Sequence, residues 1–112
     1  MNDMPRIIAE LTFLTPADGG RRNQPPQPPW GADGCWYMPH AVVDRQSEYL
    51  GVRFVGGPAI ESGEPGRFEL ALMYPQVDYS ALQPGVAITI REGGRIVARG
   101  RVLERTGQPI SG

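Results

Sequence analysis

Three side chains in this sequence are of the types that carry out nucleophilic catalysis together, namely Cys35, His40 and Asp44. A thiol can attack, an imidazole can take its proton and a carboxylate can orient the imidazole. In a β-strand, however, positions 35 and 40 differ by an odd number and point to opposite faces. We therefore interpret Cys35 as a small buried thiol and His40 as incidental, and we predict no catalytic residue and no enzymatic activity.

Metal and paired-carboxylate chemistry have little support in the sequence. One cysteine and one histidine cannot supply the four ligands of a structural zinc site. The aspartates occupy turn-like positions, where their side chains commonly bond the local backbone: Asp18, Asp33, Asp44 and Asp78. No pair of acids suited to glycosidase chemistry is apparent. We predict no metal and no cofactor.

The cations are more informative, because all 11 of them are arginines. Arginine guanidinium groups bind phosphates and carboxylates through two parallel hydrogen bonds, in bidentate geometry. Alternation places three arginines on one strand face and three more at nearby turns: Arg91, Arg99, Arg101, Arg21, Arg22 and Arg95. This set is either a binding site or a solvated face paired with Glu69, Glu92 and Glu104. A net charge of −1 argues against general polyanion binding.

A proline-rich loop over residues 23–34 contains a further candidate, Trp30. The four prolines between residues 25 and 29 favour an extended, polyproline-like chain. A loop of this length is often functional, and Trp30 is then an exposed anchor for a protein partner. In the alternative interpretation, the indole folds back and covers one end of the core. The sequence favours neither over the other.

These side chains have to be positioned by strands, because apolar residues alternate with polar ones and helical periodicity is hard to find. The sequence has 15 glycines and 12 prolines, which indicates many turns. Six alternating segments are predicted as strands: 6–14, 35–43, 50–55, 67–74, 86–91 and 95–104. This pattern predicts an all-β fold, a small six-stranded antiparallel barrel.

The last hairpin permits a prediction of register. A two-residue loop at Gly93-Gly94 would turn Arg99 and Arg101 toward the core, at a high desolvation cost. A three-residue loop that includes Arg95 and carries a bulge shifts the register by one residue. Ile96, Ala98, Gly100 and Val102 then line the core, while Arg91, Arg99 and Arg101 face outward. We also expect a positive φ at both glycines.

Length and composition bound the organisation of the chain. With 112 residues, 40% of them hydrophobic, the chain is predicted to form a single domain over residues 1–112. The barrel is expected over about residues 6–106, with a frayed tail over 107–112. No apolar run approaches the roughly 18 residues of a membrane span, and the first five residues do not have the pattern of a signal peptide. We therefore expect a cytoplasmic protein.

Three segments resemble the C-terminal β-barrel domain, domain 3, of translation elongation factor Tu. They are residues 8–15 (IAELTFLT), 19–21 (GGR) and 90–97 (IREGGRIV). Three shorter matches follow in the same order, Trp36-Tyr37-Met38, Pro65-Gly66 and Tyr74-Pro75. The resemblance spans about residues 6–106 and implies the same six-stranded barrel.

The resemblance also implies two possible ligands. In the factor this domain helps to hold aminoacyl-tRNA and packs on the GTPase domain, and the matching tRNA-facing residues are Arg21, Glu92 and Gly93. Arg22 and Tyr74 replace residues typical of that surface, so about half of it is present. The sequence has no phosphate-binding loop ending in Gly-Lys-Ser/Thr, so no nucleotide is expected. The leading prediction is a non-catalytic module that binds another protein, with mimicry of the factor as one form of it. The alternative is binding of a tRNA-like RNA backbone.

Overall fold

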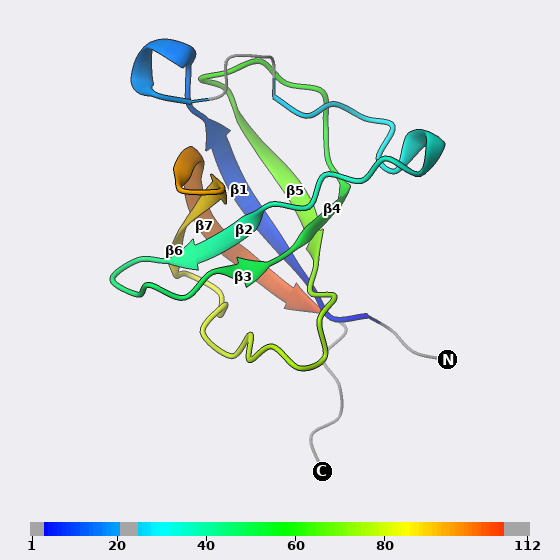
Figure 1. Ribbon diagram of the computed structural model, residues 1–112, viewed down its shortest axis with the longest axis vertical. Helices are drawn as coiled ribbons and strands as arrows, with labels where there is room; N and C mark the ends of the chain where they lie inside the picture. Colours follow the sequence, from blue (N-terminus) through cyan, green and yellow to red (C-terminus); the bar gives the residue numbers. More distant parts are fainter. Residues whose placement is uncertain (1–3, 21–24, 107–112) are drawn as a thin grey trace.

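Alternation of apolar and polar residues produces seven strands in the computed structural model, which describes residues 4–20 and 25–106 (Figure 1). The strands are β1 (Arg6–Phe13), β2 (His40–Val43), β3 (Leu50–Gly51), β4 (Arg53–Gly56), β5 (Pro65–Ala71), β6 (Ala87–Glu92) and β7 (Arg95–Thr106). Two single-turn 3₁₀ helices, η1 (Pro16–Asp18) and η2 (Ala32–Gly34), lie in the loops. No α-helix occurs in the described part of the chain, so the predicted all-β class is confirmed.

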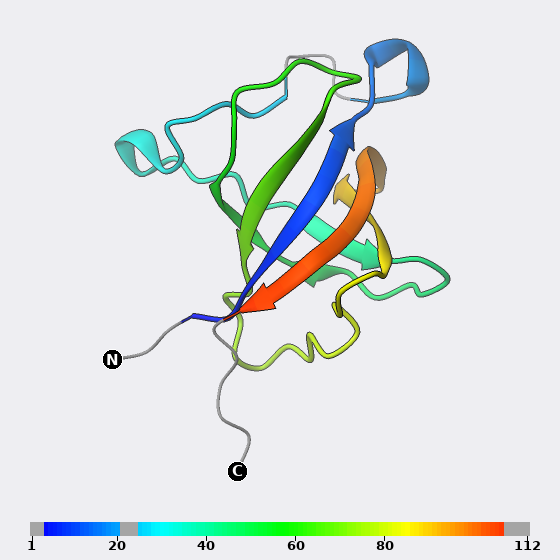
Figure 2. The same ribbon diagram turned by 180° about the vertical axis from the view of Figure 1, so that it is seen from behind.

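All seven strands belong to one antiparallel sheet, in the order β3-β2-β6-β7-β1-β5-β4. The sheet curls into a half-barrel, with β2, β3 and β4 in front of the core in Figure 1 and β1, β5 and β7 in front in the reverse view of Figure 2. Its two outer strands, β3 and β4, follow each other in the chain with Val52 between them. The molecule therefore presents two outer faces on opposite sides of one core.

The predicted number of six strands is wrong, because the segment 50–55 changes partner in its middle. Before Val52 the segment pairs with β2, and after Val52 it pairs with β5. Residues 37–39, which precede β2, remain hydrogen-bonded to the segment 50–55 beyond this point. The Val52 N–H donates to the Pro39 carbonyl at 3.0 Å, and the Phe54 N–H donates to the Tyr37 carbonyl at 3.0 Å. Local alternation is unbroken through this switch, which is why the sequence shows a single strand.

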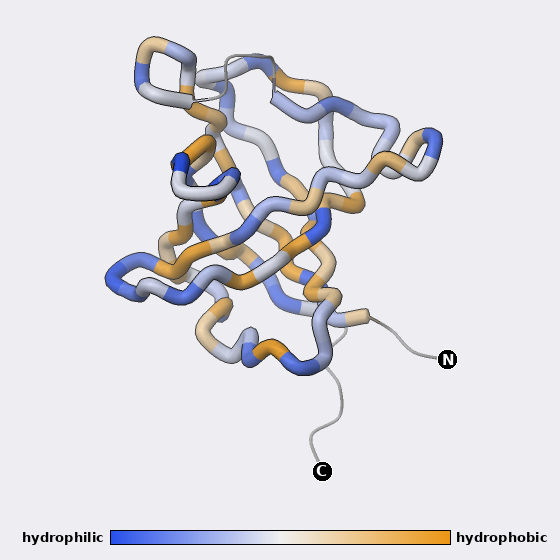
Figure 3. The backbone as a smooth tube through the Cα atoms, viewed as in Figure 1, coloured by the Kyte–Doolittle hydropathy of each residue, from blue (hydrophilic) through white to orange (hydrophobic). Residues whose placement is uncertain are grey.

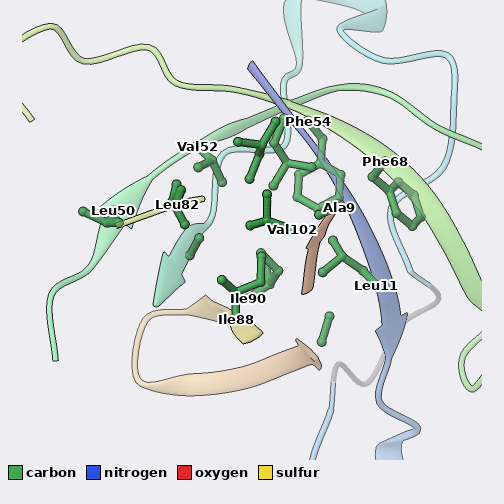
Figure 4. Close-up of a cluster of buried hydrophobic side chains, with 14 of the residues drawn as sticks. Ala9, Leu11, Leu50, Val52, Phe54, Phe68, Leu82, Ile88, Ile90 and Val102 are labelled. Atoms are coloured by element: carbon green, nitrogen blue, oxygen red, sulfur yellow. The ribbon is translucent and has the colours of Figure 1, made fainter. Parts of the chain in front are cut away.

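The core lies between the two layers and is built from the alternating positions of the strands (Figure 4). Figure 3 shows apolar stretches recurring along the strands, while the loop between β2 and β3 is hydrophilic. Three phenylalanines form its aromatic centre, with ring centroids 6.2 Å apart for Phe13 and Phe54 and 5.4 Å apart for Phe54 and Phe68. Edge-on and tilted packing at these separations is favourable.

The long connection between β5 and β6 closes one end of this core. Tyr79 and Leu82 from the connection are buried. The Tyr79 hydroxyl donates to the Gly51 carbonyl at 2.6 Å and accepts the Tyr74 N–H at 3.3 Å. An Arg105 guanidinium nitrogen donates to the Tyr79 carbonyl at 2.7 Å. These bonds fix the connection to both β3 and β7.

The β6–β7 hairpin confirms the predicted outward direction of Arg99 and Arg101 but not the predicted loop. Ile88 pairs with Gly100 and Ile90 pairs with Ala98, as the burial argument required, and Arg99 and Arg101 are exposed. The loop, however, has two residues, since Glu92 pairs with Arg95. The extra residue is Val97, inside the strand, where the register shifts.

This shift corrects one core residue. Val97 is fully buried, whereas Ile96 pairs with Arg91 and is half-buried, so the prediction that Ile96 lines the core is wrong. Avoiding buried arginines requires one extra residue somewhere in the hairpin, and a bulge at Val97 satisfies this as well as a longer loop does. Of the two turn glycines, Gly93 has a φ of +61° and Gly94 lies outside the left-handed region. A positive φ at the first central residue alone is typical of a type II′ turn.

Candidate functional site

Three of the predicted patch arginines lie on the outer side of the β6–β7 hairpin, as the register predicted. Arg99 and Arg101 project from β7 on the outer face formed with β1 and β5. Arg91 is their neighbour on β6, because Thr89 pairs with Arg99 and its hydroxyl accepts a hydrogen bond from Arg91, and Arg91 also pairs with His40 of β2. Arg95 is exposed at the hairpin turn, and Arg21 and Arg22 lie outside the described residues.

The outer face of β1, β5 and β7 alternates positive and negative side chains. Glu10 of β1 pairs with Arg67 on one side and with Arg101 on the other. Arg101 approaches the Glu10 carboxylate to 4.0 Å, and Arg6 forms an ion pair with Glu69. Exposed pairs of this kind contribute little to stability. This face is balanced in charge and has the character of a solvated exterior.

The predicted tRNA-facing set is represented by Glu92 and Gly93 at the hairpin turn. The Tyr37 hydroxyl donates to the Glu92 carboxylate at 2.6 Å, which ties the turn to the chain ahead of β2. Glu92 is therefore engaged within the protein. Because Arg21 lies outside the described residues, RNA binding by this set stays a prediction.

Trp30 packs on the core. Its indole N–H donates to the Gly57 carbonyl at 3.1 Å, and its ring lies 5.7 Å from Phe54 and 6.2 Å from Phe68, centroid to centroid. Gln27 of the same loop donates to the Ile60 carbonyl at 2.8 Å. Of the two interpretations of the loop, the structure agrees with the one in which the indole covers one end of the core.

Cys35, His40 and Asp44 show no catalytic arrangement. Cys35 is exposed, so our interpretation of it as a buried thiol is wrong, because β2 begins only at His40. His40 makes an edge-on contact with the Tyr49 ring at 5.6 Å. Asp44 follows β2, and its N–H donates to the Ala87 carbonyl at 2.9 Å. Within residues 4–20 and 25–106, no three His, Cys, Asp or Glu side chains gather as metal ligands would.

Sequence reasoning missed a different surface, on the outer side of β2, β3 and β4. Five large hydrophobic side chains in the described ranges are exposed by between 38 and 49%, and four of them lie on or against these strands. We call this surface the aromatic face and define it by seven residues: Trp36, Met38, His40, Tyr49, Arg53, Tyr74 and Arg91.

The ladder between β2 and β3 places these residues side by side. His40 pairs with Gly51 and Arg91, and Ala41 pairs with Leu50. Because Leu50, Val52 and Phe54 point into the core, residues 49, 51 and 53 point outward. By the same alternation, residues 36 and 38 share the outward side of His40. Gly51 leaves room for the Tyr74 ring, since a Cβ there would lie 2.6 Å from it.

The two arginines of the aromatic face are each stacked on an aromatic ring. The Arg53 guanidinium lies over the Trp36 indole, 4.7 Å from its centroid, and the Arg91 guanidinium lies 5.5 Å from the Tyr49 centroid. Arg91 also donates to the Thr89 hydroxyl at 3.1 Å and to the Tyr49 hydroxyl at 3.3 Å. Cation–π contacts favour these positions of the guanidinium groups over the rings. None of the seven residues is acidic.

One sequence signal points to this face in retrospect. Residues 36, 38 and 40 alternate with core positions and have large aromatic or apolar side chains, and so does Tyr49 at an outward position across the ladder. A strand with large side chains on both sides is typical of one that is covered on both sides. The non-local pairing of segment 36–40 with 49–54 was needed to see it.

The loop between β2 and β3 forms a pocket of about 530 Å³ beside this face, lined by Arg45, Gln46, Ser47 and Glu48. Its lining comes from four consecutive residues of one exposed loop. Small-molecule sites are typically lined by apolar side chains with a few converging polar groups. This pocket lacks that composition.

The chain was also compared with known proteins. No protein-family model matches the sequence, and no curated protein sequence matches it. Across the described residues, no helix is long and apolar enough to cross a membrane. The functional argument therefore depends on the surfaces described above.

Proposed function

We propose that this chain is a non-catalytic, cytoplasmic module that binds another protein through the aromatic face. We further propose that its sheet is a barrel of the type found in domain 3 of elongation factor Tu, which the sequence resembles. The observation that carries the binding proposal is the clustering of Trp36, Met38, Tyr49 and Tyr74, all exposed, on one face of the molecule.

The composition of this face supports a protein ligand. Tryptophan, tyrosine, methionine and arginine are enriched at the centres of protein–protein interfaces, and lysine and the acidic residues are depleted there. Exposed apolar side chains that gather on one surface mark interaction sites more often than scattered ones do. The opposite face, with Glu10 between Arg67 and Arg101, has the mixed charge of ordinary exterior.

The test compares single substitutions on the two faces. The protein is immobilised and exposed to cell lysate with and without nuclease, beside two variants, Met38→Asp on the aromatic face and Arg99→Glu on β7, outside the aromatic face. Both side chains are exposed, so both variants should fold. We expect the wild type and Arg99→Glu to capture the same lysate proteins, with or without nuclease. Met38→Asp should fail to capture them. Loss with Arg99→Glu alone would contradict the proposal and move the site to the arginines of β7. Nuclease-sensitive capture would favour the RNA alternative.

A further inference from the structure

The charges of the aromatic face indicate the chemistry of its partner. Its two arginines, Arg53 and Arg91, are stacked on rings of the same face, and none of the other five members of the face has a carboxylate side chain. On the opposite face, by contrast, Arg6 and Arg101 each have a glutamate partner. The aromatic face therefore has two oriented guanidinium groups and no carboxylate of its own.

The Arg53 guanidinium is placed over the Trp36 indole, 4.7 Å from its centroid, so the contact with the ring favours one orientation of the group before a partner binds. A carboxylate can accept two parallel hydrogen bonds from one guanidinium, and such charge-assisted bonds are stronger than neutral ones.

We infer that the aromatic face binds an acidic peptide segment of its partner, with one carboxylate at Arg53, a second at Arg91 and an apolar side chain over Met38. This inference rests on the proposed function and adds the partner's chemistry to it. The contact at Met38 supplies apolar burial, because Met38 is exposed by 49% and flexible methionine side chains adapt to varied partners.

The register sets the spacing of the two carboxylates. His40 pairs with both Arg91 and Gly51, and Arg53 is two residues beyond Gly51 along the strand. Two strand spacings of about 4.8 Å and a rise of about 6.6 Å place the two arginine Cα atoms about 12 Å apart. An extended peptide covers that distance in about four residues. The acidic residues of the partner should therefore be three to five positions apart.

The same geometry disfavours a single-stranded nucleic acid as the ligand. Single-strand binders stack bases on open aromatic faces and neutralise many phosphates. The Trp36 indole is already in contact with the Arg53 guanidinium and with Gly31, where an added Cβ would lie 2.4 Å from the ring. The Tyr49 ring is in contact with both Arg91 and His40. Two arginines on a chain of net charge −1 also supply little phosphate neutralisation.

The test is selection from a phage-displayed library of random dodecapeptides on the folded protein, followed by affinity measurements with the selected peptides. Four variants are compared: Arg53→Gln, Arg91→Gln, Met38→Asp and, as a matched control of equal charge loss on β7 outside the aromatic face, Arg99→Gln. We expect acidic peptides with the spacing given above. We expect each of Arg53→Gln and Arg91→Gln to weaken their binding about tenfold, the effect of losing one charge-assisted bond. Arg99→Gln should leave it within about twofold. Thermal melting of each variant identifies any that has lost its fold.

The outcomes separate this inference from the proposed function. Selected peptides that lose binding with Met38→Asp but show no acidic residues would overturn the inference and leave the proposed function standing. Peptides that bind independently of Met38, or no selected peptide at all, would overturn both. An oligouridine probe that displaces the acidic peptides, and whose binding also depends on Arg53 and Arg91, would overturn both in favour of RNA.

Discussion

Gly93 and Gly94 occupy the same turn but have different backbone requirements. At Gly93, φ is +61°, which L side chains rarely adopt, while Gly94 lies outside this region. Neither position has an atom within 4 Å of an added Cβ, so crowding does not contribute. We expect Gly93→Ala to lower the free energy of unfolding by about 1 kcal/mol, and Gly94→Ala to change it by less than half of that. Urea denaturation measures both. Equal losses would show that the turn has a different geometry.

Tyr79 is the residue with the clearest polar role in the interior. Its hydroxyl donates to the Gly51 carbonyl and accepts the Tyr74 N–H. Tyr79→Phe removes the partner of both groups, so we expect a loss of about 1–3 kcal/mol of stability at neutral pH. Unfolding in urea at pH 8 is the measurement. A loss below about 0.5 kcal/mol would mean that these bonds do not hold the β5–β6 connection in place.

The same tyrosine predicts a dependence on alkaline pH. Burial is the main cause that raises the pKa of Tyr79 above its usual value of 10.0. Below pH 10 the phenol is neutral in both states, and above it the unfolded chain ionises first. The stability that Tyr79 supplies is therefore fully present at neutral pH and is lost as the pH rises through its raised pKa. The difference in melting temperature between wild type and Tyr79→Phe should shrink between pH 9 and pH 11. A constant difference would contradict this assignment.

At the scale of elements, the loop that contains Trp30 is part of the core's closure. The indole contacts Phe54 and Phe68 and bonds the Gly57 carbonyl. Trp30→Ala should therefore reduce stability by about 3 kcal/mol, at the lower end of the range for removing a buried aromatic ring. Trp36→Ala, at an exposed indole on the aromatic face, should cost less stability but weaken partner binding. Chemical denaturation and the lysate capture described above measure the two effects. The opposite pattern would make Trp30 the partner's anchor.

The elements also show what the sequence can and cannot predict. Alternation identified the segments 6–14, 50–55 and 67–74 as strands because the side-chain period is local. The outward direction of Arg99 followed from the cost of burying it, but the extra residue could lie anywhere in the hairpin, and it lies at Val97. The division at Val52 was invisible because a change of pairing partner leaves no local trace.

The candidate site was harder to predict than the fold for the same reason. The arginines of β6 and β7 were identified as one patch because alternation and the hairpin register place them on the same outward side. The structure assigns Arg91 to the neighbourhood of Tyr49 and Arg101 to that of Glu10. The aromatic face joins residues 36–40, 49–53, 74 and 91, whose proximity depends on tertiary structure. Sequence reasoning had treated Trp36 and Met38 as part of a strand and of the family resemblance, and had not considered them as binding residues.

At the scale of the whole molecule, the central claim is that two opposite faces differ in function. The strands β2, β3 and β4 lie on one side of the core and β1, β5 and β7 on the other (Figures 1 and 2). The face of β1, β5 and β7 is balanced in charge, and the aromatic face has exposed aromatic side chains with two arginines. Interfaces of folded proteins use aromatic and arginine residues as anchors, surrounded by side chains that exclude water. A face of this composition should therefore be protected in a complex while the opposite face remains accessible.

Site-specific photo-crosslinking tests this claim most directly. A benzophenone amino acid replaces Met38 in one variant and Arg99 in another, and both are irradiated in nuclease-treated lysate. We predict discrete protein adducts from position 38 and none from position 99. Adducts from position 99 with none from position 38 would contradict our assignment of the binding surface. Adducts to RNA in a sample without nuclease, at either position, would contradict the proposal that the ligand is a protein.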